Sequence, residues 1–118
     1  MSTTVLIVDD HPSFRTSARA VLEAYGFEIV GEVEDGAAAL VAVAELAPDV
    51  VLLDIQLPDM TGFDVCEALE SRNGSAPAVV LVSSRDVTDY GDLIGESRAR
   101  GFVPKAELSG EAVAALVR

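Results

Sequence analysis

The sequence has one cysteine and no long hydrophobic run, and both shortages exclude classes of protein. Because Cys66 is the only cysteine among 118 residues, no internal disulfide can form, as is usual in a reducing cytoplasm. Apolar runs such as Val50–Leu53 and Ala78–Val82 are far shorter than the ~18 residues that cross a bilayer. The N-terminus lacks the basic and apolar regions of an export signal. We therefore expect a cytoplasmic protein without a membrane segment.

Basic residues are also scarce. Lysine and arginine number 8 against 20 aspartates and glutamates, which gives a formal net charge of −12. This balance argues against a chain that binds nucleic acid or an anionic membrane by itself. Half of the residues are hydrophobic and 24% are charged, as in a folded globular domain. The length is that of one domain, so we expect residues 1–118 to form a single unit.

Five short apolar runs alternate with segments of helical periodicity. Several of the runs are rich in β-branched residues and end at polar residues, which is typical of buried strands. The predicted strands are Val5–Val8, Phe27–Val33, Val50–Leu53, Val79–Val82 and Gly101–Val103. The second of these is the most polar and is expected near an edge of the sheet. Apolar strands separated by helices indicate an α/β fold with a parallel, doubly wound sheet and helices on both faces.

The helices between these strands have recognisable start and stop signals. Pro12 suits the first turn of a helix that Gly26 ends, and Asp35 can cap a second helix that Pro48 stops. Further helices are predicted around Phe63, Cys66 and Leu69, over Asp86–Ser97, and after Ser109, with a loop at Asn73–Pro77. The Asp86–Ser97 helix has the weakest pattern, because two glycines and three aspartates interrupt it.

Polar side chains follow four of the predicted strands. Asp9 and Asp10 follow the first strand, Asp54 the third, Ser83 the fourth and Lys105 the fifth. Right-handed crossovers bring these strand ends to one edge of the sheet, where such folds bind ligands. Carboxylates ~4 Å apart repel by roughly 4 kcal/mol at an effective dielectric of about 20, so a cation is needed to neutralise them. Magnesium, which prefers oxygen ligands, fits this set.

The same residues suit phosphoryl transfer. A carboxylate beside magnesium, faced by a lysine and a hydroxyl, can accept a phosphoryl group and form an acyl phosphate. Asp54 is the candidate nucleophile, because it follows the central strand and leaves the two acids after the first strand to hold the metal. Lys105 and Ser83 are donors suited to phosphoryl oxygens.

Four motifs, each at a predicted strand end, carry a resemblance to a known family. They are Val8–Asp10, Asp54–Gly62, Val82–Ser83 and Gly101–Lys105. Each is weak alone, and the four in this order are specific. Over essentially its whole length the chain resembles the receiver domain of two-component response regulators. The resemblance implies the flavodoxin-like strand order 2-1-3-4-5, and it implies a signalling switch that assists its own phosphorylation and dephosphorylation rather than an enzyme.

The resemblance assigns roles to the acidic residues. Asp54 becomes the phosphoacceptor, which a sensor histidine kinase phosphorylates in a Mg²⁺-dependent reaction. Asp10 becomes a direct metal ligand and Asp9 a second acid that acts through water. The backbone carbonyl of Gln56 completes the protein ligands, so the implied metal set is Asp9, Asp10, Asp54 and Gln56.

The resemblance also implies a conformational switch. Ser83 would hydrogen-bond the phosphoryl group, Lys105 would pair with it, and Phe102 would turn inward to fill the space vacated. The face built from the fourth helix, fifth strand and last helix would then change its affinity for a partner. That face also allows a homodimer. The start of the chain and the stretch around Lys105 are similar to receivers attached to helix-turn-helix domains that regulate transcription. DNA would be bound only through such an output domain, which this chain does not contain.

Each of these residues also has an ordinary structural interpretation. The paired acids could simply cap the following helix, and Lys105 could be a solvated surface charge. We interpret His11 as a residue at a helix start rather than a ligand, because the chemistry already has its acids. Cys66 is expected to be a small core residue, and Phe102 could be plain core packing.

The sequence departs from the commoner family pattern in several places. The hydroxyl position carries serine rather than threonine, and Phe102 has no hydroxyl, so we expect no tyrosine hydrogen bond in the switch. A proline precedes Lys105, as Pro104, where many receivers have one directly after the lysine. The glycine-rich Asp86–Ser97 segment is atypical, so the output face is expected to be mobile or short.

Three other functions are possible for an α/β chain of this kind. A haloacid dehalogenase-type hydrolase needs a second aspartate two residues after a nucleophile on the first strand, where this chain has His11 or Pro12. A flavin carrier needs a hydroxyl- and glycine-rich phosphate loop in place of Asp9 and Asp10. A phosphorylation-independent interaction domain remains the alternative. Whether the receiver stands alone or belongs to a longer DNA-binding regulator stays open.

Overall fold

The computed structural model describes residues 2–71 and 76–117. Five parallel strands form one sheet in the order β2-β1-β3-β4-β5. They are β1 (Thr4–Val8), β2 (Glu28–Val33), β3 (Val50–Asp54), β4 (Ala78–Ser83) and β5 (Gly101–Pro104). The predicted fold, strand order and edge position of the second strand are confirmed. Most of the predicted loop at Asn73–Pro77 lies outside the described residues.

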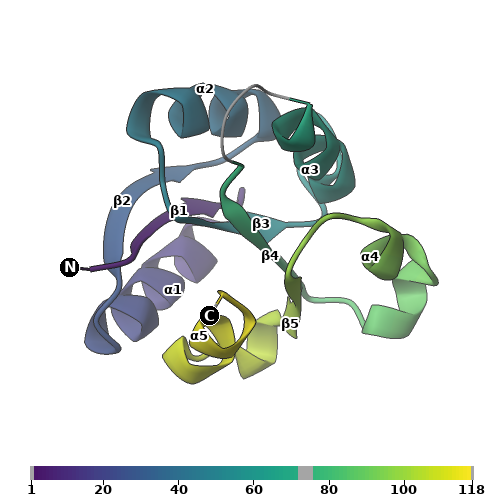
Figure 1. Ribbon diagram of the computed structural model, residues 1–118. Helices are drawn as coiled ribbons and strands as arrows, with labels where there is room; N and C mark the ends of the chain where they lie inside the picture. Colours follow the sequence, from purple (N-terminus) through teal and green to yellow (C-terminus); the bar gives the residue numbers. More distant parts are fainter. Residues whose placement is uncertain (1, 72–75, 118) are drawn as a thin grey trace.

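Helices cover both faces of this sheet. They are α1 (Pro12–Ala24), α2 (Gly36–Leu46), α3 (Gly62–Glu70), α4 (Leu93–Glu96) and α5 (Gly110–Val117), with two 3₁₀ turns, η1 (Val87–Tyr90) and η2 (Lys105–Glu107). Figure 1 shows α2 and α3 on one side of the sheet and α1 and α5 on the other. The short α4 packs beside β5 at the edge of the sheet. Among the described residues, no helix combines the length and the apolar character that a membrane crossing requires.

The expected start and stop signals account for several helix ends. Pro12 occupies the first turn of α1. At α2, the Asp35 side chain accepts a hydrogen bond from the Ala38 N–H at 2.8 Å and so satisfies one of the free donors of the first turn. That helix ends at Leu46, and Ala47 takes a left-handed conformation with φ 45° before Pro48.

Alternating residues of the strands build two hydrophobic layers. Because successive side chains point to opposite faces, each strand contributes to both layers. One layer joins the strands to α1 and α5 through Val5, Ile7, Leu22, Val50, Leu52, Val80, Val82 and Val113. The other joins them to α2 and α3 through Leu6, Val8, Val43, Val51, Leu53, Val65, Leu69 and Leu81. Cys66 is buried in the second layer, as expected, and burial raises the pKa of its thiol to about 11.

The predicted helix over Asp86–Ser97 is wrong in its length. The segment instead forms the 3₁₀ turn η1 and the four-residue helix α4. Gly91 lies between them with φ 56° and ψ −126°, a conformation that only glycine adopts at little cost. A continuous helix cannot pass through that position, so the helix that the output face carries here is short, as one of the two expectations for this segment had it.

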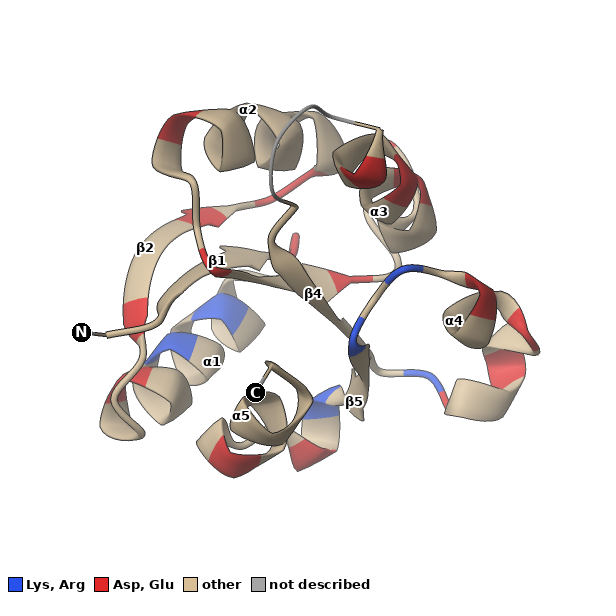
Figure 2. Ribbon diagram, in the orientation of Figure 1, with Lys and Arg blue, Asp and Glu red and all other residues tan. Residues whose placement is uncertain are grey.

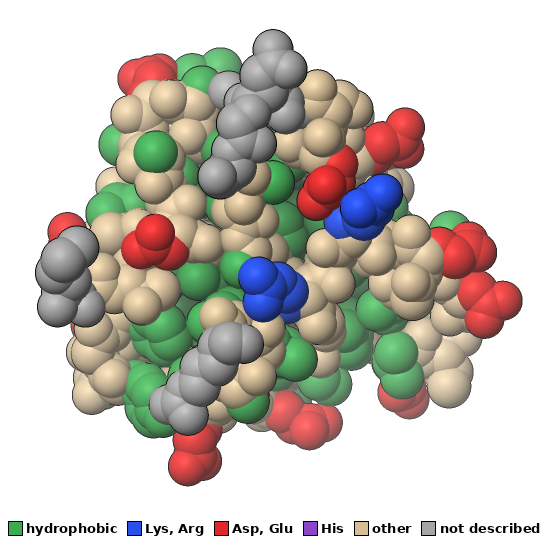
Figure 3. Space-filling model, in the orientation of Figure 1, with side chains coloured by type: hydrophobic (Ala, Val, Ile, Leu, Met, Phe, Trp, Pro, Cys, Tyr) green, Lys and Arg blue, Asp and Glu red, His purple; other side chains and the backbone are tan. Residues whose placement is uncertain are grey.

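Charges are distributed unevenly over the fold. Figure 2 shows acidic residues on most elements and basic residues mainly on α1 and around β5. The cations of α1 are already paired, since Arg19 Nε lies 2.6 Å from a Glu32 carboxylate oxygen and Arg15 Nε lies 3.4 Å from the other. On the described part of the face seen in Figure 3, most acidic side chains lie toward the periphery, and one of the basic side chains lies directly beside an acidic one. This face therefore does not resemble a surface for nucleic acid.

Candidate functional site

The carboxyl ends of four strands meet at one edge of the sheet, which we call the carboxyl edge. Parallel register sets the positions: Val8 pairs with Leu53, so Asp9 follows β1 beside Asp54, the last residue of β3. Ser83, the last residue of β4, pairs with Pro104, the last residue of β5. The side chains that the sequence placed after the strands therefore lie at the same edge, and Asp54 and Ser83 belong to the strands themselves.

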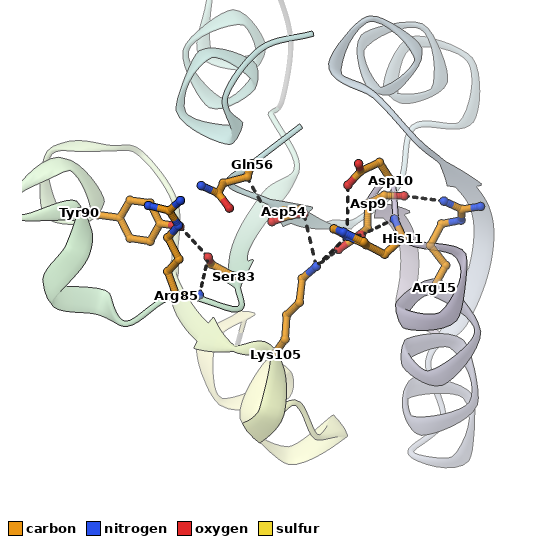
Figure 4. A network of polar contacts seen from close by, with 10 residues as sticks. All are labelled: Asp9, Asp10, His11, Arg15, Asp54, Gln56, Ser83, Arg85, Tyr90 and Lys105. Carbon is orange, nitrogen blue, oxygen red and sulfur yellow. Dashed lines mark hydrogen bonds and ion pairs between the residues drawn. The ribbon is translucent and has the colours of Figure 1, made fainter. Parts of the chain in front are cut away.

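Asp9, Asp10 and Asp54 form a compact acidic cluster (Figure 4). One carboxylate oxygen from each, together with a ring nitrogen of His11, lie within 4.8 Å of one another. Asp9 is fully buried, Asp54 is 2% exposed and Asp10 is partly exposed. Burial strengthens the repulsion between carboxylates, so this cluster is stable only beside positive charge.

Lys105 supplies part of that charge. Its Nζ lies 2.6 Å from Asp9 Oδ2 and 3.3 Å from Asp54 Oδ2, and so joins the ends of β1 and β3. The ammonium also lies over the ring of Phe14, 4.6 Å from its centroid, a cation–π contact with α1. The lysine side chain is only 14% exposed, so its interpretation as a solvated surface charge is wrong.

The negative charge of the acidic cluster is only partly balanced by its neighbours. Burial is the main cause that raises the pKa of Asp54 above its ordinary value, and the charge of Asp9 raises it further. Lys105 and the Gln56 N–H, which donates to Asp54 Oδ1 at 3.2 Å, offset only part of this. Lys105 supplies one positive charge beside the three carboxylates of Asp9, Asp10 and Asp54, so a further cation would lower the repulsion between them.

Two buried oxygens show where further donors or a cation would be accepted. Asp9 Oδ2 meets Lys105 as an ion pair but, like Asp10 Oδ1, it accepts no hydrogen bond from the described residues. Buried polar atoms without a hydrogen bond are rare in native proteins and point to a further partner. A donor set made of carboxylate oxygens suits a hard dication such as magnesium. The residues present therefore fit a divalent cation site.

The His11 ring contacts the acidic cluster, although the sequence indicated only a residue at a helix start. It occupies the N-cap position of α1, which confirms its place at a helix start, and its N–H donates to Asp9 Oδ1 at 2.8 Å. Its Nδ1 lies 3.0 Å from Asp9 Oδ1, 3.2 Å from Asp10 Oδ1 and 3.5 Å from Lys105 Nζ. Adjacency to Asp9 and Asp10 was the one sequence signal for this contact. The ring is 62% exposed, so it borders the cluster on the solvent side.

Arg15 is a contributor that the sequence did not single out. Its Nη1 donates to the Asp9 backbone carbonyl at 2.6 Å while its Nε pairs with Glu32 of β2. The arginine therefore ties the loop after β1 to the neighbouring strand. Only its place one turn into the helix could have suggested this role.

Ser83 makes its contacts away from the acidic cluster. It is 1% exposed, and its Oγ accepts from the Arg85 N–H at 3.0 Å and lies 2.6 Å from the Tyr90 hydroxyl oxygen. Among the described residues, no hydrogen bond joins it to Asp54. A tyrosine hydroxyl nevertheless lies beside Ser83, that of Tyr90 of η1 rather than of the residue at position 102, and the sequence did not predict this contact. The seven-residue separation of Tyr90 from Ser83 gave no signal in the sequence.

Aromatic rings and an amide border the same region. The Tyr90 ring lies 5.9 Å from that of Phe63 and 6.2 Å from that of Phe102, which is half-buried. With its amide oxygen turned toward Arg85, the Gln56 side chain accepts from Nε at 3.0 Å and from Nη2 at 3.3 Å. Phe102 thus packs against Tyr90 rather than against the acidic cluster.

Comparisons with known proteins agree with this geometry. The family model described as "Response regulator receiver domain" matches residues 5–117. The DNA-binding response regulator MtrA of Mycolicibacterium smegmatis is 42% identical over 111 residues, which cover 93% of this chain and 47% of that protein. The DNA-binding transcriptional activator EvgA of Escherichia coli K12 is 33% identical, with 94% of this chain and 54% of that protein covered. The chain thus spans about half the length of these relatives.

Solved structures give the same result. A two-component response regulator of the LuxR family from Aurantimonas sp. SI85-9A1 superposes with a TM-score of 0.87 at 26% identity, covering 99% of this chain and 86% of that one. A CheY-like receiver domain from Methylobacillus flagellatus, at 24% identity and a TM-score of 0.85, supports the fold over 100% of both chains. The acidic carboxyl edge, the strand order and these relatives together show that the chain belongs to the receiver domains of two-component response regulators.

Proposed function

We propose that this receiver accepts a phosphoryl group on Asp54 from a sensor histidine kinase in a magnesium-dependent reaction. The observation that carries the proposal is the setting of Asp54, a buried carboxylate whose neighbours are Asp9, Asp10 and Lys105. A carboxylate oxygen of Asp54 attacks the phosphorus of a phosphohistidine. A P–O bond forms, the P–N bond breaks, and the electron pair stays on the imidazole nitrogen.

The chain's own residues prepare Asp54 for this step. Because burial and Asp9 raise the pKa of Asp54, its nucleophilic anion needs nearby positive charge. Lys105 supplies some of it, through a contact of 3.3 Å between Nζ and Oδ2. After transfer, Lys105 would pair with the phosphoryl oxygens in place of the carboxylates it now contacts. The same contacts would assist hydrolysis, in which water attacks the phosphorus, the P–O bond to Asp54 breaks, and inorganic phosphate leaves the free carboxylate.

The acidic cluster would hold the metal. Asp9, Asp10 and Asp54 provide the carboxylates, and the backbone carbonyl of Gln56 is the further ligand expected from the family resemblance. Two of the oxygens concerned are buried and accept no hydrogen bond from the described residues: Asp9 Oδ2, which lies 2.6 Å from Lys105 Nζ, and Asp10 Oδ1, which lies 3.2 Å from His11 Nδ1. When bound, magnesium offsets the negative charge of the phosphoryl oxygens beside these carboxylates.

The phosphorylated form would act through the face that carries α4, β5 and α5. Ser83 and Phe102 are the proposed switch residues, because Ser83 ends β4, which lies between β3 and β5, and Phe102 belongs to β5 of that face. The two relatives described above are named as DNA-binding regulators and are about twice as long as this chain. The proposed output is accordingly a DNA-binding domain outside these residues or a separate partner, and a homodimer through the same face belongs to this proposal.

Mass spectrometry after incubation with magnesium and a small phosphodonor tests the proposal. One phosphoryl group should be added, it should be labile to hydroxylamine, and Asp54→Asn should abolish it. Asp92→Asn is the matched control, because Asp92 is exposed and its side chain makes no capping bond at α4. Retention of the label in Asp54→Asn would place the acceptor elsewhere. Lys105→Ala should leave the fold intact and impair the response to phosphorylation, as far-ultraviolet dichroism and phosphorylation assays would show.

A further inference from the structure

The hydroxyl of Ser83 makes its two hydrogen bonds on the side away from Asp54. A serine hydroxyl has one proton to donate and two lone pairs to accept with. In this structure it accepts from the Arg85 N–H and shares a 2.6 Å hydrogen bond with the Tyr90 hydroxyl. Figure 4 shows Tyr90 and Arg85 on one side of Ser83, with Lys105 and Asp54 on the other. When Ser83 is the donor to the Tyr90 oxygen, its only proton is used in that bond, so donation to a phosphoryl group on Asp54 requires Ser83 to give up Tyr90.

The position of Tyr90 is set by local structure. The Asp89 carboxylate accepts from the Asp86 N–H at 3.2 Å, the Asp89 N–H donates to the Asp86 carbonyl at 3.0 Å, and Gly91 turns the chain directly after Tyr90. The tyrosine ring packs edge-on against Phe63 and at a tilt against Phe102. Two aromatic neighbours thus aim the phenol oxygen at Ser83, which is itself buried.

We infer that Tyr90 is a positioning residue that holds Ser83 in the resting state, and that phosphorylation of Asp54 releases it. The inference rests on the proposed function, because the competing acceptor is the phosphoryl group on Asp54. Rotation about the single χ1 bond of Ser83 exchanges one partner for the other. Loss of the Ser83 contact then frees η1, so the chemical event reaches the segment between β4 and β5 through one hydrogen bond.

Reciprocity gives the direction of the effect. If phosphorylation weakens the Tyr90–Ser83 bond, then removal of the bond must favour the phosphorylated form. Tyr90→Phe deletes the hydroxyl and keeps the ring that packs on Phe63. The variant should therefore bind beryllofluoride, a mimic of a phosphoryl group on a carboxylate, about three- to tenfold more tightly in the presence of magnesium, the effect of roughly one net hydrogen bond.

The experiment uses the 118-residue chain and first measures beryllofluoride binding by fluorine NMR. Tyr25→Phe and Ser84→Ala are the matched controls, because both residues are exposed and lie outside the contact, and their affinities should equal that of the wild type. Tightening in Tyr90→Phe alone supports the inference. Unchanged or weaker binding in Tyr90→Phe overturns it, since a residue that merely stabilised the fold would not tighten binding when shortened.

Fluorescence gives an independent readout. The chain has two tyrosines and no tryptophan, so Tyr90 is the only strong emitter in Tyr25→Phe. In that protein, saturation with beryllofluoride should change the Tyr90 emission, and Ser83→Ala should give the changed emission before any ligand is added. Emission that stays constant while the ligand is bound overturns the inference and leaves the proposed function standing. If the wild-type chain binds no beryllofluoride, the proposed function fails and the inference fails with it.

Discussion

The segment after β1 and the segment after β4 start from the same edge of the sheet and differ in how they are held. After β1, the chain enters the 13-residue helix α1, which buries Ala18 and Leu22, and Arg15 and Lys105 tie the loop to other elements. After β4, the chain enters η1 and α4, in which no residue is buried. Val87 and Leu93 are 45% and 50% exposed there.

The difference shows how a receiver can keep chemistry and response apart. Carboxylates that repel each other need rigid surroundings, because a small displacement changes their mutual energy strongly. A segment that must respond to a single new charge needs the opposite, a low cost of local rearrangement. The structure meets both needs at one edge, with the acidic cluster on the well-packed segment and the Tyr90–Ser83 contact on the loosely packed one.

Hydrogen exchange should give the largest contrast. We expect amides in Asp89–Gly95 to exchange faster than those in Phe14–Leu22 by several orders of magnitude. Local opening of the first segment exposes only partly buried side chains such as Tyr90 and Ile94, whereas opening of helix α1 exposes the fully buried Ala18 and Leu22. Mass spectrometry of peptides from the native protein measures both segments in one sample. Comparable protection in the two would remove the contrast.

A matched pair of leucines should differ by the next largest amount. Leu52 is fully buried in the sheet, so Leu52→Ala should lower the free energy of unfolding by about 2–5 kcal/mol. Leu93 of α4 is 50% exposed, and Leu93→Ala should cost less than about 1 kcal/mol. Urea denaturation followed by circular dichroism gives both values. Similar losses would mean that α4 is packed as firmly as the sheet.

Two glycines should respond to alanine with opposite signs. A Cβ at Gly62 would lie 2.7 Å from the Asp54 carbonyl oxygen and 3.0 Å from the Ile55 Cα, so Gly62→Ala should cost about 1–3 kcal/mol and disturb the end of β3. A Cβ at Gly95 of α4 meets nothing within 4 Å, and Gly95→Ala should stabilise the helix by up to about 1 kcal/mol. The same denaturation assay applies. Equal destabilisation of both variants would contradict this reading of the two sites.

The smallest expected effect on stability concerns Asp59, in the loop between β3 and α3. Asp59 accepts from the Gly36 and Ala37 N–H groups at 2.8 and 3.0 Å, and these bonds lower the pKa of its carboxyl. The unfolded chain therefore binds this proton more readily, so the stabilisation is present above the ordinary carboxyl pKa and is lost as pH falls through the lowered one. Asp59→Asn should be less stable than the wild type at neutral pH.

That difference should shrink in acid. Thermal unfolding of Asp59→Asn and wild type between neutral pH and about pH 3 measures it, with Asp92→Asn as the control for loss of one exposed charge. A deficit that stays constant across this range would mean that the carboxylate charge of Asp59 is not what holds the start of α2.

Much of the fold could be predicted because its signals are local. Strands such as Val50–Leu53 are buried on both faces and so are continuously apolar, and Asp35 and Pro12 mark helix starts by chemistry that acts within a few residues. The acidic cluster followed from topology, since parallel strands bring their ends together whatever lies between them. The close approach of Lys105 to Asp9 and Asp54 needed only that argument.

The features that escaped prediction depend on tertiary contacts. The contact of Tyr90 with Ser83 requires the left-handed Gly91 and the rings of Phe63 and Phe102, none of which is set by the residues next to Tyr90. The split of Asp86–Ser97 has the same origin. The contacts of the His11 ring depend on a side-chain orientation, on which helix periodicity carries no information.

The two outermost strands have a consequence for how this protein meets other chains. β5 has four residues and ends in Pro104, which has no N–H to offer a further strand, and β2 carries Glu28 and Glu32, whose charges disfavour edge-to-edge pairing. Growth of the sheet by addition of a foreign strand is thus discouraged at both margins. The protein can therefore resist aggregation through its strand edges while its helices and loops stay available for contact with other chains.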